Sequence, residues 1–188
     1  LLARRFSPRA MHGRAIPPEL ITRLFNAARW APSSRNEQPW EFVVVRREQA
    51  EAHAAAVDVL MPRNRLWAGE AGLLVLGIAR ATNADGSPNG FAQYDLGQAV
   101  AHLSLQATSE GLRVHQMGGF DRAKARAVFA VPEGHEPAVM IAIGYPGDAA
   151  LLPEEVGELH QEAVPGGVAQ GVVHQLEAVD VNRNDRGP

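Results

Sequence analysis

Two segments of the chain carry apolar residues at helical spacing. The first follows Pro18 and stops before Pro32, because the residue before a proline avoids the α region. The second runs over 93–110 and is followed by Gly111, a residue typical of helix ends. Both segments therefore predict helices with one apolar face. The apolar positions are Leu20, Ile21, Leu24, Phe25 and Ala28 in the first, and Leu96, Ala99, Val100, Leu103 and Ala107 in the second.

Three short runs are apolar throughout and predict strands buried on both faces. Two further helices are expected between them, an Ala-rich one over 48–60 and one that begins at Asp121, a good N-cap, and continues to about 130. Polar or glycine-rich stretches, among them 33–39 and 82–89, predict loops. Strands interleaved with helices indicate a layered α/β or α+β domain. The strand runs are 42–45, 72–78 and 138–143.

Composition narrows the possible functions. The 188 residues are enough for one domain with a proper core, and the absence of Cys excludes disulfides, thiolate metal sites and Cys nucleophiles. The net charge of −3 argues against a general nucleic-acid or anionic-membrane binder. No apolar run approaches the roughly 20 residues that a membrane span needs. We see no signal peptide and expect a cytoplasmic protein.

Familiar catalytic and nucleotide motifs are missing from the sequence. None of the seven His residues forms an H-x-H, H-E-x-x-H or i,i+4 pair, so we expect no metal site. No G-x-S-x-G elbow, G-x-G-x-x-G loop or Walker A loop occurs. We therefore expect no catalytic side chain.

Two polar segments suggest chemistry instead. Arg4, Arg5 and Arg9 gather around Ser7, and guanidinium and hydroxyl donors suit a phosphate, although by themselves they are more simply explained as a solvated basic terminus. The segment 32–40, PSSRNEQPW, places hydrogen-bonding side chains between two prolines before a Trp. Such a loop can bind the edge of a flat heterocycle, or it can simply connect a helix to a strand.

Taken together, these segments resemble the FMN-dependent nitroreductase family. The P-S-S-x-N-x-Q-P-W block is specific, whereas the Arg–Ser block alone is weak. The resemblance covers about four-fifths of the chain in the family's order. It rests on 4–9 (RRFSPR), 31–40 (APSSRNEQPW), 42–45 (FVVV), 95–107 (DLGQAVAHLSLQA), 111–112 (GL), 115–121 (HQMGGFD) and 142–146 (AIGYP).

The resemblance implies an α+β, three-layer fold with a central, mostly antiparallel sheet, completed as a homodimer with FMN at the interface. Arg5, Ser7 and Arg9 would hold the phosphate and ribityl end, and Gly118 and Gly119 would face the ring near N5. The loop after the first helix would reach the flavin of the partner subunit. The expected cofactor-binding residues are Arg4, Arg5, Ser7, Arg9, Pro32, Ser33, Ser34, Asn36, Asn64, Gln116, Met117, Gly118 and Gly119, with Asn64 placed just before the second strand.

The implied activity is a ping-pong reaction that passes a hydride from NADH or NADPH through flavin N5 to a nitroaromatic, quinone or similar acceptor. The flavin would carry the chemistry. Two alternatives stay open at this point: a flavin-binding protein without turnover, and a cofactor-free dimeric relative. Met117 and Phe120 either shape the substrate pocket or pack in the core.

The chain departs from the family at three places. His102 stands where Asn is common, and Arg113 replaces the second Gly of Gly-Leu-Gly. The family's tail carries a basic pair at the flavin phosphate, but Arg183 and Arg186 are the only cations after Arg126 and no motif places them there. We therefore expect an FMN-binding domain over 1–148, an atypical tail over 149–188 that is disordered or swapped onto the partner, and weakened phosphate binding.

Overall fold

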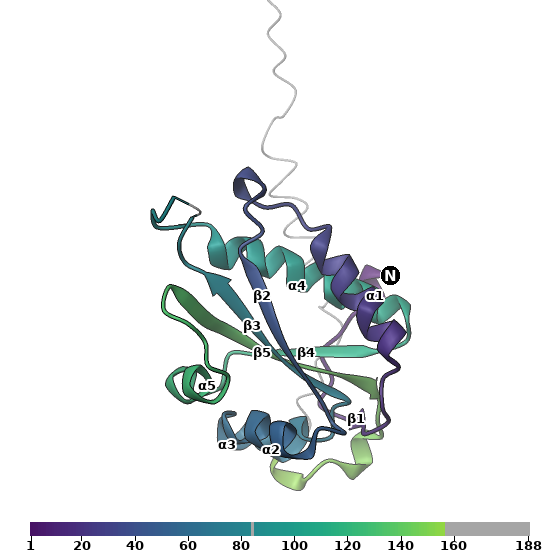
Figure 1. The fold of residues 1–188 in the computed structure, drawn as a ribbon. Helices are drawn as coiled ribbons and strands as arrows, with labels where there is room; N and C mark the ends of the chain where they lie inside the picture. The colour runs from purple at the N-terminus through teal and green to yellow at the C-terminus, as the bar shows by residue number, and fades with distance from the viewer. Residues whose placement is uncertain (84, 157–188) are drawn as a thin grey trace, which may run out of the picture.

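The computed structural model describes residues 1–83 and 85–156, which form a twisted antiparallel sheet covered by helices on both faces (Figure 1). The order across the sheet is β2, β3, β5 and β4, and β1 pairs with the last residues of β5. Every strand pair in this part of the chain is antiparallel. The strands are β1 (Met11–His12), β2 (Trp40–Arg46), β3 (Leu73–Arg80), β4 (Arg113–Met117) and β5 (His135–Pro146).

The helices form the two outer layers of the molecule. In Figure 1, α1 and α4 lie above the sheet, and α2, α3 and α5 lie below it. This is the α+β, three-layer arrangement with an antiparallel sheet that the resemblance implied. The α-helices are α1 (Pro18–Arg29), α2 (Ala50–Asp58), α3 (Pro62–Ala68), α4 (Ala92–Ser109) and α5 (Arg122–Val128). Single turns of 3-10 helix are η1 (Leu2–Arg4), η2 (Ser34–Asn36), η3 (Ala149–Leu151) and η4 (Glu154–Val156).

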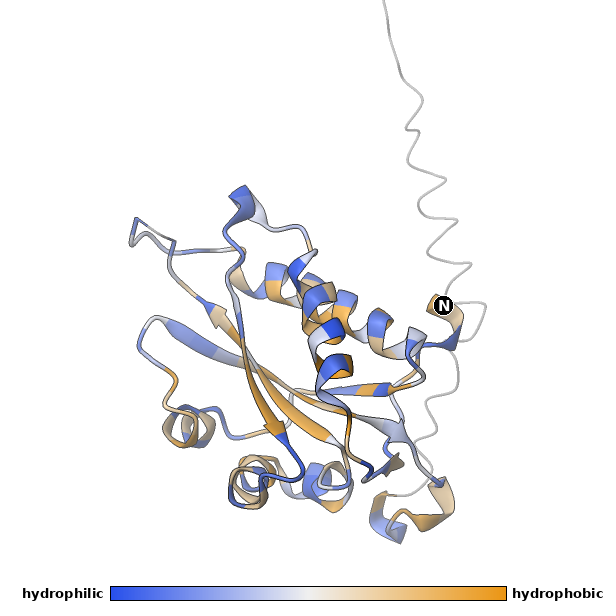
Figure 2. Ribbon diagram, turned by 45° about the vertical axis from the view of Figure 1, so that its right-hand side comes forward, coloured by the Kyte–Doolittle hydropathy of each residue, from blue (hydrophilic) through white to orange (hydrophobic). Residues whose placement is uncertain are grey.

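Strand β3, in the middle of the sheet, shows why its apolar run has no polar face. Its residues alternate between the two layers: Leu73 and Val75 pack with α1 and α4, while Leu74 and Leu76 pack with α2, α3 and α5. Side chains on both sides of the strand are therefore removed from water, as the continuous hydrophobic pattern predicted. Figure 2 shows the same distribution, with hydrophobic residues along the strands and on the helix sides that face them.

The caps of α4 and α5 follow the predictions. Gly111 has a φ of 79°, and its N–H and that of Leu112 donate to the carbonyls of Thr108 and Ala107, which is a Schellman motif. At α5, the carboxylate of Asp121 accepts a hydrogen bond from the Lys124 N–H over 2.9 Å. The expected bounds of these helices were wrong by only one or two residues.

Three expectations about local structure were wrong. The run 42–45 is not buried on both faces, because β2 is an edge strand and only Val45 of that run is fully buried. The helix expected over 48–60 ends at Asp58, and Pro62 begins a further helix, α3, because a proline fits the first turn, where its missing N–H costs nothing. Asn64 therefore lies within α3 rather than in a connection before β3. Strand β4 was also missed: it lies at the sheet edge, and its polar Arg113, His115 and Gln116 hide the apolar signal.

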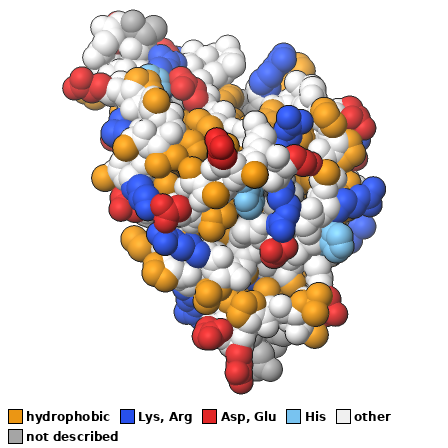
Figure 3. Space-filling view, turned by 60° about the horizontal axis from the view of Figure 1, so that its bottom comes forward, with side chains coloured by type: hydrophobic (Ala, Val, Ile, Leu, Met, Phe, Trp, Pro, Cys, Tyr) orange, Lys and Arg blue, Asp and Glu red, His pale blue; other side chains and the backbone are white. Residues whose placement is uncertain are grey.

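Helix length and surface charge are the remaining features of the described residues. None of the described helices is long and apolar enough to cross a membrane. On the face shown in Figure 3, acidic and basic side chains are interspersed with apolar ones, without a broad basic patch.

Of the expected tail, residues 149–156 belong to the described fold, and Val156 is buried. The rest of that tail, 157–188 with Arg183 and Arg186, lies outside the described residues.

Candidate functional site

The N-terminal Arg–Ser segment lies along the edge strand β4. The Pro8 carbonyl is 3.0 Å from Nδ1 of His115, and the Arg113 guanidinium lies 5.1 Å from the centre of the Phe6 ring. Arg5 donates to the Ser7 hydroxyl over 3.2 Å, so two of the expected phosphate donors are in contact. Arg4, at the end of η1, is exposed.

Arg9 is partly buried and lies within the electrostatic influence of a second arginine. It donates to the Val156 carbonyl over 3.2 Å, and its buried Nε has no hydrogen-bond partner among the described residues. Burial, and then the nearby charge of Arg63 in α3, lower the pKa of Arg9. Among residues 1–83 and 85–156, neither guanidinium forms an ion pair with a carboxylate. Two guanidinium groups that influence each other and form no ion pair with an acid in the described part of the chain are suited to an anion. Sequence reasoning missed Arg63 because it missed α3.

Asn64 is adjacent to Arg63 in the first turn of α3 and contacts the glycine pair. Its side-chain N–H donates to the Gly119 carbonyl over 2.9 Å, and the same oxygen accepts from the Met61 N–H at 3.0 Å. A Cβ on Gly118 would meet no atom within 4 Å, so the backbone there is open to close approach. The structure thus joins Asn64 to Gly119 and sets Arg9 within the electrostatic influence of α3, while Arg5 and Ser7 lie on the same N-terminal segment as Arg9.

Three other residues of this region either pack in the core or contact an element other than α3. Met117 and Phe120 are each 3 % exposed and belong to the core between the sheet and the lower helices, so packing is the role that the structure shows. Gln116 is exposed and lies 3.4 Å from the Ser104 hydroxyl of α4.

His115 connects the N-terminal segment to the core. Its ring packs at a tilt of 46° against that of Trp67, with 4.5 Å between ring centres, and its Nδ1 faces the Pro8 carbonyl, so this nitrogen carries the proton. Burial lowers the pKa of His115, and the charge of Arg9 lowers it further, against an opposing effect of the hydrogen bond to Pro8. The structure thus favours a neutral imidazole, which adds no charge to the arginines beside it.

The second expected half of the site, the loop with Pro32, Ser33, Ser34 and Asn36, lies elsewhere. In Figures 1 and 2 the turn between α1 and β2 projects beyond the upper layer, far from α3. Within one chain, the structure does not bring this loop to Arg9 or Asn64. Any ligand that contacts both halves must therefore lie between two chains.

This loop holds an unusual backbone conformation. Arg35, Asn36 and Gln38 have φ values of 53°, 58° and 46°, in a region that costs a non-glycine residue about 1 kcal/mol or more. The Gln38 N–H donates to the Ser33 hydroxyl over 3.0 Å, and the Gln38 side chain donates to Asn36 over 3.0 Å. Strained backbone of this kind is typical of functional sites.

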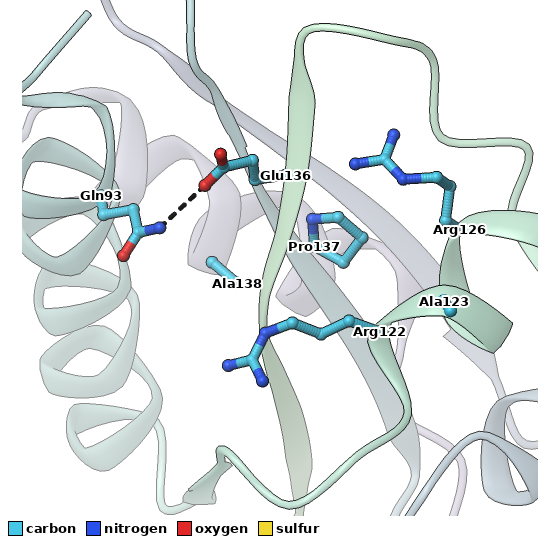
Figure 4. Close-up of a pocket in the computed structure, with 7 residues that line it drawn as sticks. All are labelled: Gln93, Arg122, Ala123, Arg126, Glu136, Pro137 and Ala138. Atoms are coloured by element: carbon cyan, nitrogen blue, oxygen red, sulfur yellow. Dashed lines mark hydrogen bonds between the residues drawn. The ribbon is translucent and has the colours of Figure 1, made fainter.

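A shallow hollow of about 210 Å³ lies between α4, α5 and the first residues of β5 (Figure 4). Gln93 donates to Glu136 over 2.9 Å at its edge, and Arg122 extends across it from α5. The Arg126 guanidinium donates hydrogen bonds to the carbonyls of Val131, Pro132 and His135. No expected cofactor residue lines the hollow, so it forms no part of the predicted site.

Comparison with known proteins then decides the family. The model of the nitroreductase family matches residues 2–145, most of the chain. The chain belongs to this family. A relative from Methanothermobacter thermautotrophicus, named "Putative NADH dehydrogenase/NAD(P)H nitroreductase", is 31% identical over 149 residues, which cover 77% of this chain and 74% of the relative.

Solved structures of nitroreductase-family proteins agree with this assignment. A crystal structure described as "the oxidoreductase containing FMN" is 33% identical and has a TM-score of 0.79, covering 83% of this chain and 80% of the other. A family member from Clostridium difficile 630 has a TM-score of 0.67 at 21% identity, with 88% and 92% of the chains covered, and supports the fold. The chain is thus a nitroreductase-family oxidoreductase. Among the described residues, no group of three His, Asp or Glu side chains is placed to hold a metal ion.

Proposed function

We propose that this chain binds FMN non-covalently and catalyses hydride transfer from NADH or NADPH to a nitroaromatic, quinone or similar acceptor. The observation that carries the proposal is the adjacency of two groups in the first turn of α3. The charge of Arg63 acts on Arg9, and among the described residues Arg63 pairs with no carboxylate, while Asn64 bonds the loop of Gly118 and Gly119. A single ligand with an anionic end and a flat polar end matches this arrangement, and FMN has both.

The donor set fits FMN on chemical grounds. The buried Nε of Arg9, which has no partner among residues 1–83 and 85–156, and the hydroxyl of Ser7 are suited to a phosphate, and Arg63 adds a second positive charge. The open backbone at Gly118 allows close approach of a flat ring, and the Asn64 amide is at hand for its polar edge. Bound FMN would supply the redox chemistry, hydride acceptance and return.

The chain's own residues would bind and orient rather than react. Arg9 is fixed by the Val156 carbonyl, and Asn64 by the Gly119 carbonyl, so both donors are positioned before a ligand arrives. His115, held to Pro8 and packed against Trp67, fixes the path of the segment that carries Ser7 and Arg9. No side chain of this region is assigned a proton-transfer role.

The proposed working form is a homodimer. The loop with Ser33, Ser34 and Asn36 lies away from Arg9 within one chain, so we assign it to the partner's flavin. Three large exposed aromatic side chains flank this loop and would be covered by a second subunit. They are Trp30, Phe91 and Tyr94, with exposed fractions of 80%, 58% and 68%.

The reaction is tested by mixing the FMN-loaded protein with NADH or NADPH under anaerobic conditions and following its visible absorption. The proposal predicts bleaching by at least one of the two donors and recovery of colour when menadione or nitrofurazone is added. Protein that binds FMN but is not bleached by either nucleotide would contradict the reaction and favour the non-catalytic alternative.

A further inference from the structure

A buried carboxylate in the upper layer holds the strained loop. Asp95, in the first turn of α4, is 1 % exposed, and its Oδ2 accepts a hydrogen bond from the Ser34 N–H over 3.0 Å. Its Oδ1 lies 3.5 Å from the Gln98 side chain. Among the described residues, Asp95 forms no ion pair. A buried carboxylate without a cation is costly, so the contact to the loop needs a reason beyond stability.

The other end of the loop is fixed separately. The Arg80 N–H donates to the Pro39 carbonyl over 2.7 Å, and its guanidinium donates to the Glu37 carbonyl over 2.9 Å. The left-handed residues Arg35 and Asn36 lie between these two attachments and are exposed. The loop is thus held at Ser34 by Asp95 and at 37–39 by Arg80, and its projecting residues are presented outward.

We propose that Asp95 is a positioning residue for the flavin site of the partner subunit. It holds Ser34, and through it the left-handed turn, in the geometry that contacts the cofactor across the dimer interface. This inference rests on the proposed function. Asp95, which is buried in α4 of one chain, thereby affects a flavin site whose phosphate-binding residues belong to the other chain.

The first test measures the loop without any cofactor. In Asp95→Leu, amide hydrogen exchange at Ser34 and the following loop residues should accelerate at least tenfold relative to wild type, whereas Asp95→Asn, which keeps an acceptor oxygen, should change it less. Thr108→Val is the matched control, because Thr108 is also buried in α4 and donates to the Ser104 carbonyl away from the loop. Equal exchange in the loop of Asp95→Leu and of the control would overturn the inference.

The second test measures FMN affinity and separates the two subunits. The FMN Kd of Asp95→Leu should rise roughly ten- to hundredfold, as expected for loss of a hydrogen bond to a charged group that positions ligand contacts. Heterodimers of Asp95→Leu with Arg9→Gln, purified through two different tags, should regain one tight site per dimer. That site combines the intact Arg9 of one chain with the intact loop of the other.

The outcomes distinguish this inference from the function on which it rests. Wild-type protein that takes up no FMN overturns the proposed function. Wild-type protein that binds FMN, with heterodimers no better than their parents, overturns the inference alone, because it shows that Asp95 acts within its own chain or on folding.

Discussion

The side chain of Asn64 and the carbonyl of Gly119 are joined by a hydrogen bond of 2.9 Å, although 55 positions separate them in the chain. The bond ties α3 to the turn that follows β4, and the Met61 N–H reinforces it on the same oxygen. Both residues belong to the predicted cofactor site. This contact therefore fixes the relative position of two parts of the site before any ligand binds.

The two neighbouring glycines should respond differently to a methyl group. A Cβ on Gly119 would lie 2.9 Å from Nδ2 of Asn64, whereas one on Gly118 would meet nothing within 4 Å. Gly119→Ala should displace the Asn64 amide and lower the free energy of unfolding of the cofactor-free protein by about 1 kcal/mol, the value of a typical hydrogen bond. Gly118→Ala should leave it nearly unchanged. Chemical denaturation of both variants checks this, and equal losses would contradict the described contact.

Removing the charge of Arg63 should weaken FMN binding without affecting riboflavin, which lacks the phosphate. A charge-assisted contact to phosphate contributes about 1.5–3 kcal/mol, so Arg63→Gln should raise the FMN Kd roughly ten- to hundredfold. Fluorescence titration with each flavin measures the two affinities.

Arg65→Gln is the matched control for that experiment. It removes the same charge from the same helix, but Arg65 is engaged by the Leu60 and Asp58 carbonyls and by the Asp58 carboxylate. The ratio of FMN to riboflavin affinity should fall only in Arg63→Gln. An equal fall in both variants would show that general charge, rather than a phosphate contact, is responsible.

The stability of the cofactor-free protein should decline as the pH falls below about 6.5, the ordinary pKa of histidine. Burial and the charge of Arg9 lower the pKa of His115 in the folded state, so the unfolded chain binds more protons in this range, and acid favours unfolding. Above this range the contribution of the neutral ring is fully present. His115→Asn should reduce the slope of unfolding free energy against pH between 7 and 5.

His53 provides the comparison for that measurement. Its pKa is also lowered, by burial and then by Arg47, so His53→Asn should remove a separate part of the slope. The effects of the two substitutions should add, because the two residues lie on different elements. An unchanged slope in His115→Asn would contradict the buried neutral state assigned to this ring.

The cap of α5 gives a test of the fold alone. Asp121→Ala removes the acceptor for the Lys124 N–H and should cost about 1 kcal/mol of stability, whereas Asp121→Ser should retain most of it. Thermal unfolding of the two variants compares them. The same loss in both would show that the cap does not stabilise the helix.

Much of the framework could be predicted because local physics determines it. The apolar spacing of α1 and α4, the glycine after α4 and the cap at Asp121 depend on neighbours in the chain, and their predictions were confirmed. Strand β4 could not be found in the same way, because its polar residues are accommodated at a sheet edge. Neither could the electrostatic effect of Arg63 on Arg9 or the hydrogen bond between Ser34 and Asp95, because each joins residues that are distant in the chain.

Whether the chain binds FMN at all is decided by equilibrium dialysis of the purified protein against FMN, with the visible spectrum recorded at saturation. The protein should take up one FMN per chain, with a flavin spectrum altered from that of free FMN. Protein that stays colourless against saturating FMN, while remaining folded by circular dichroism, would contradict the proposed function.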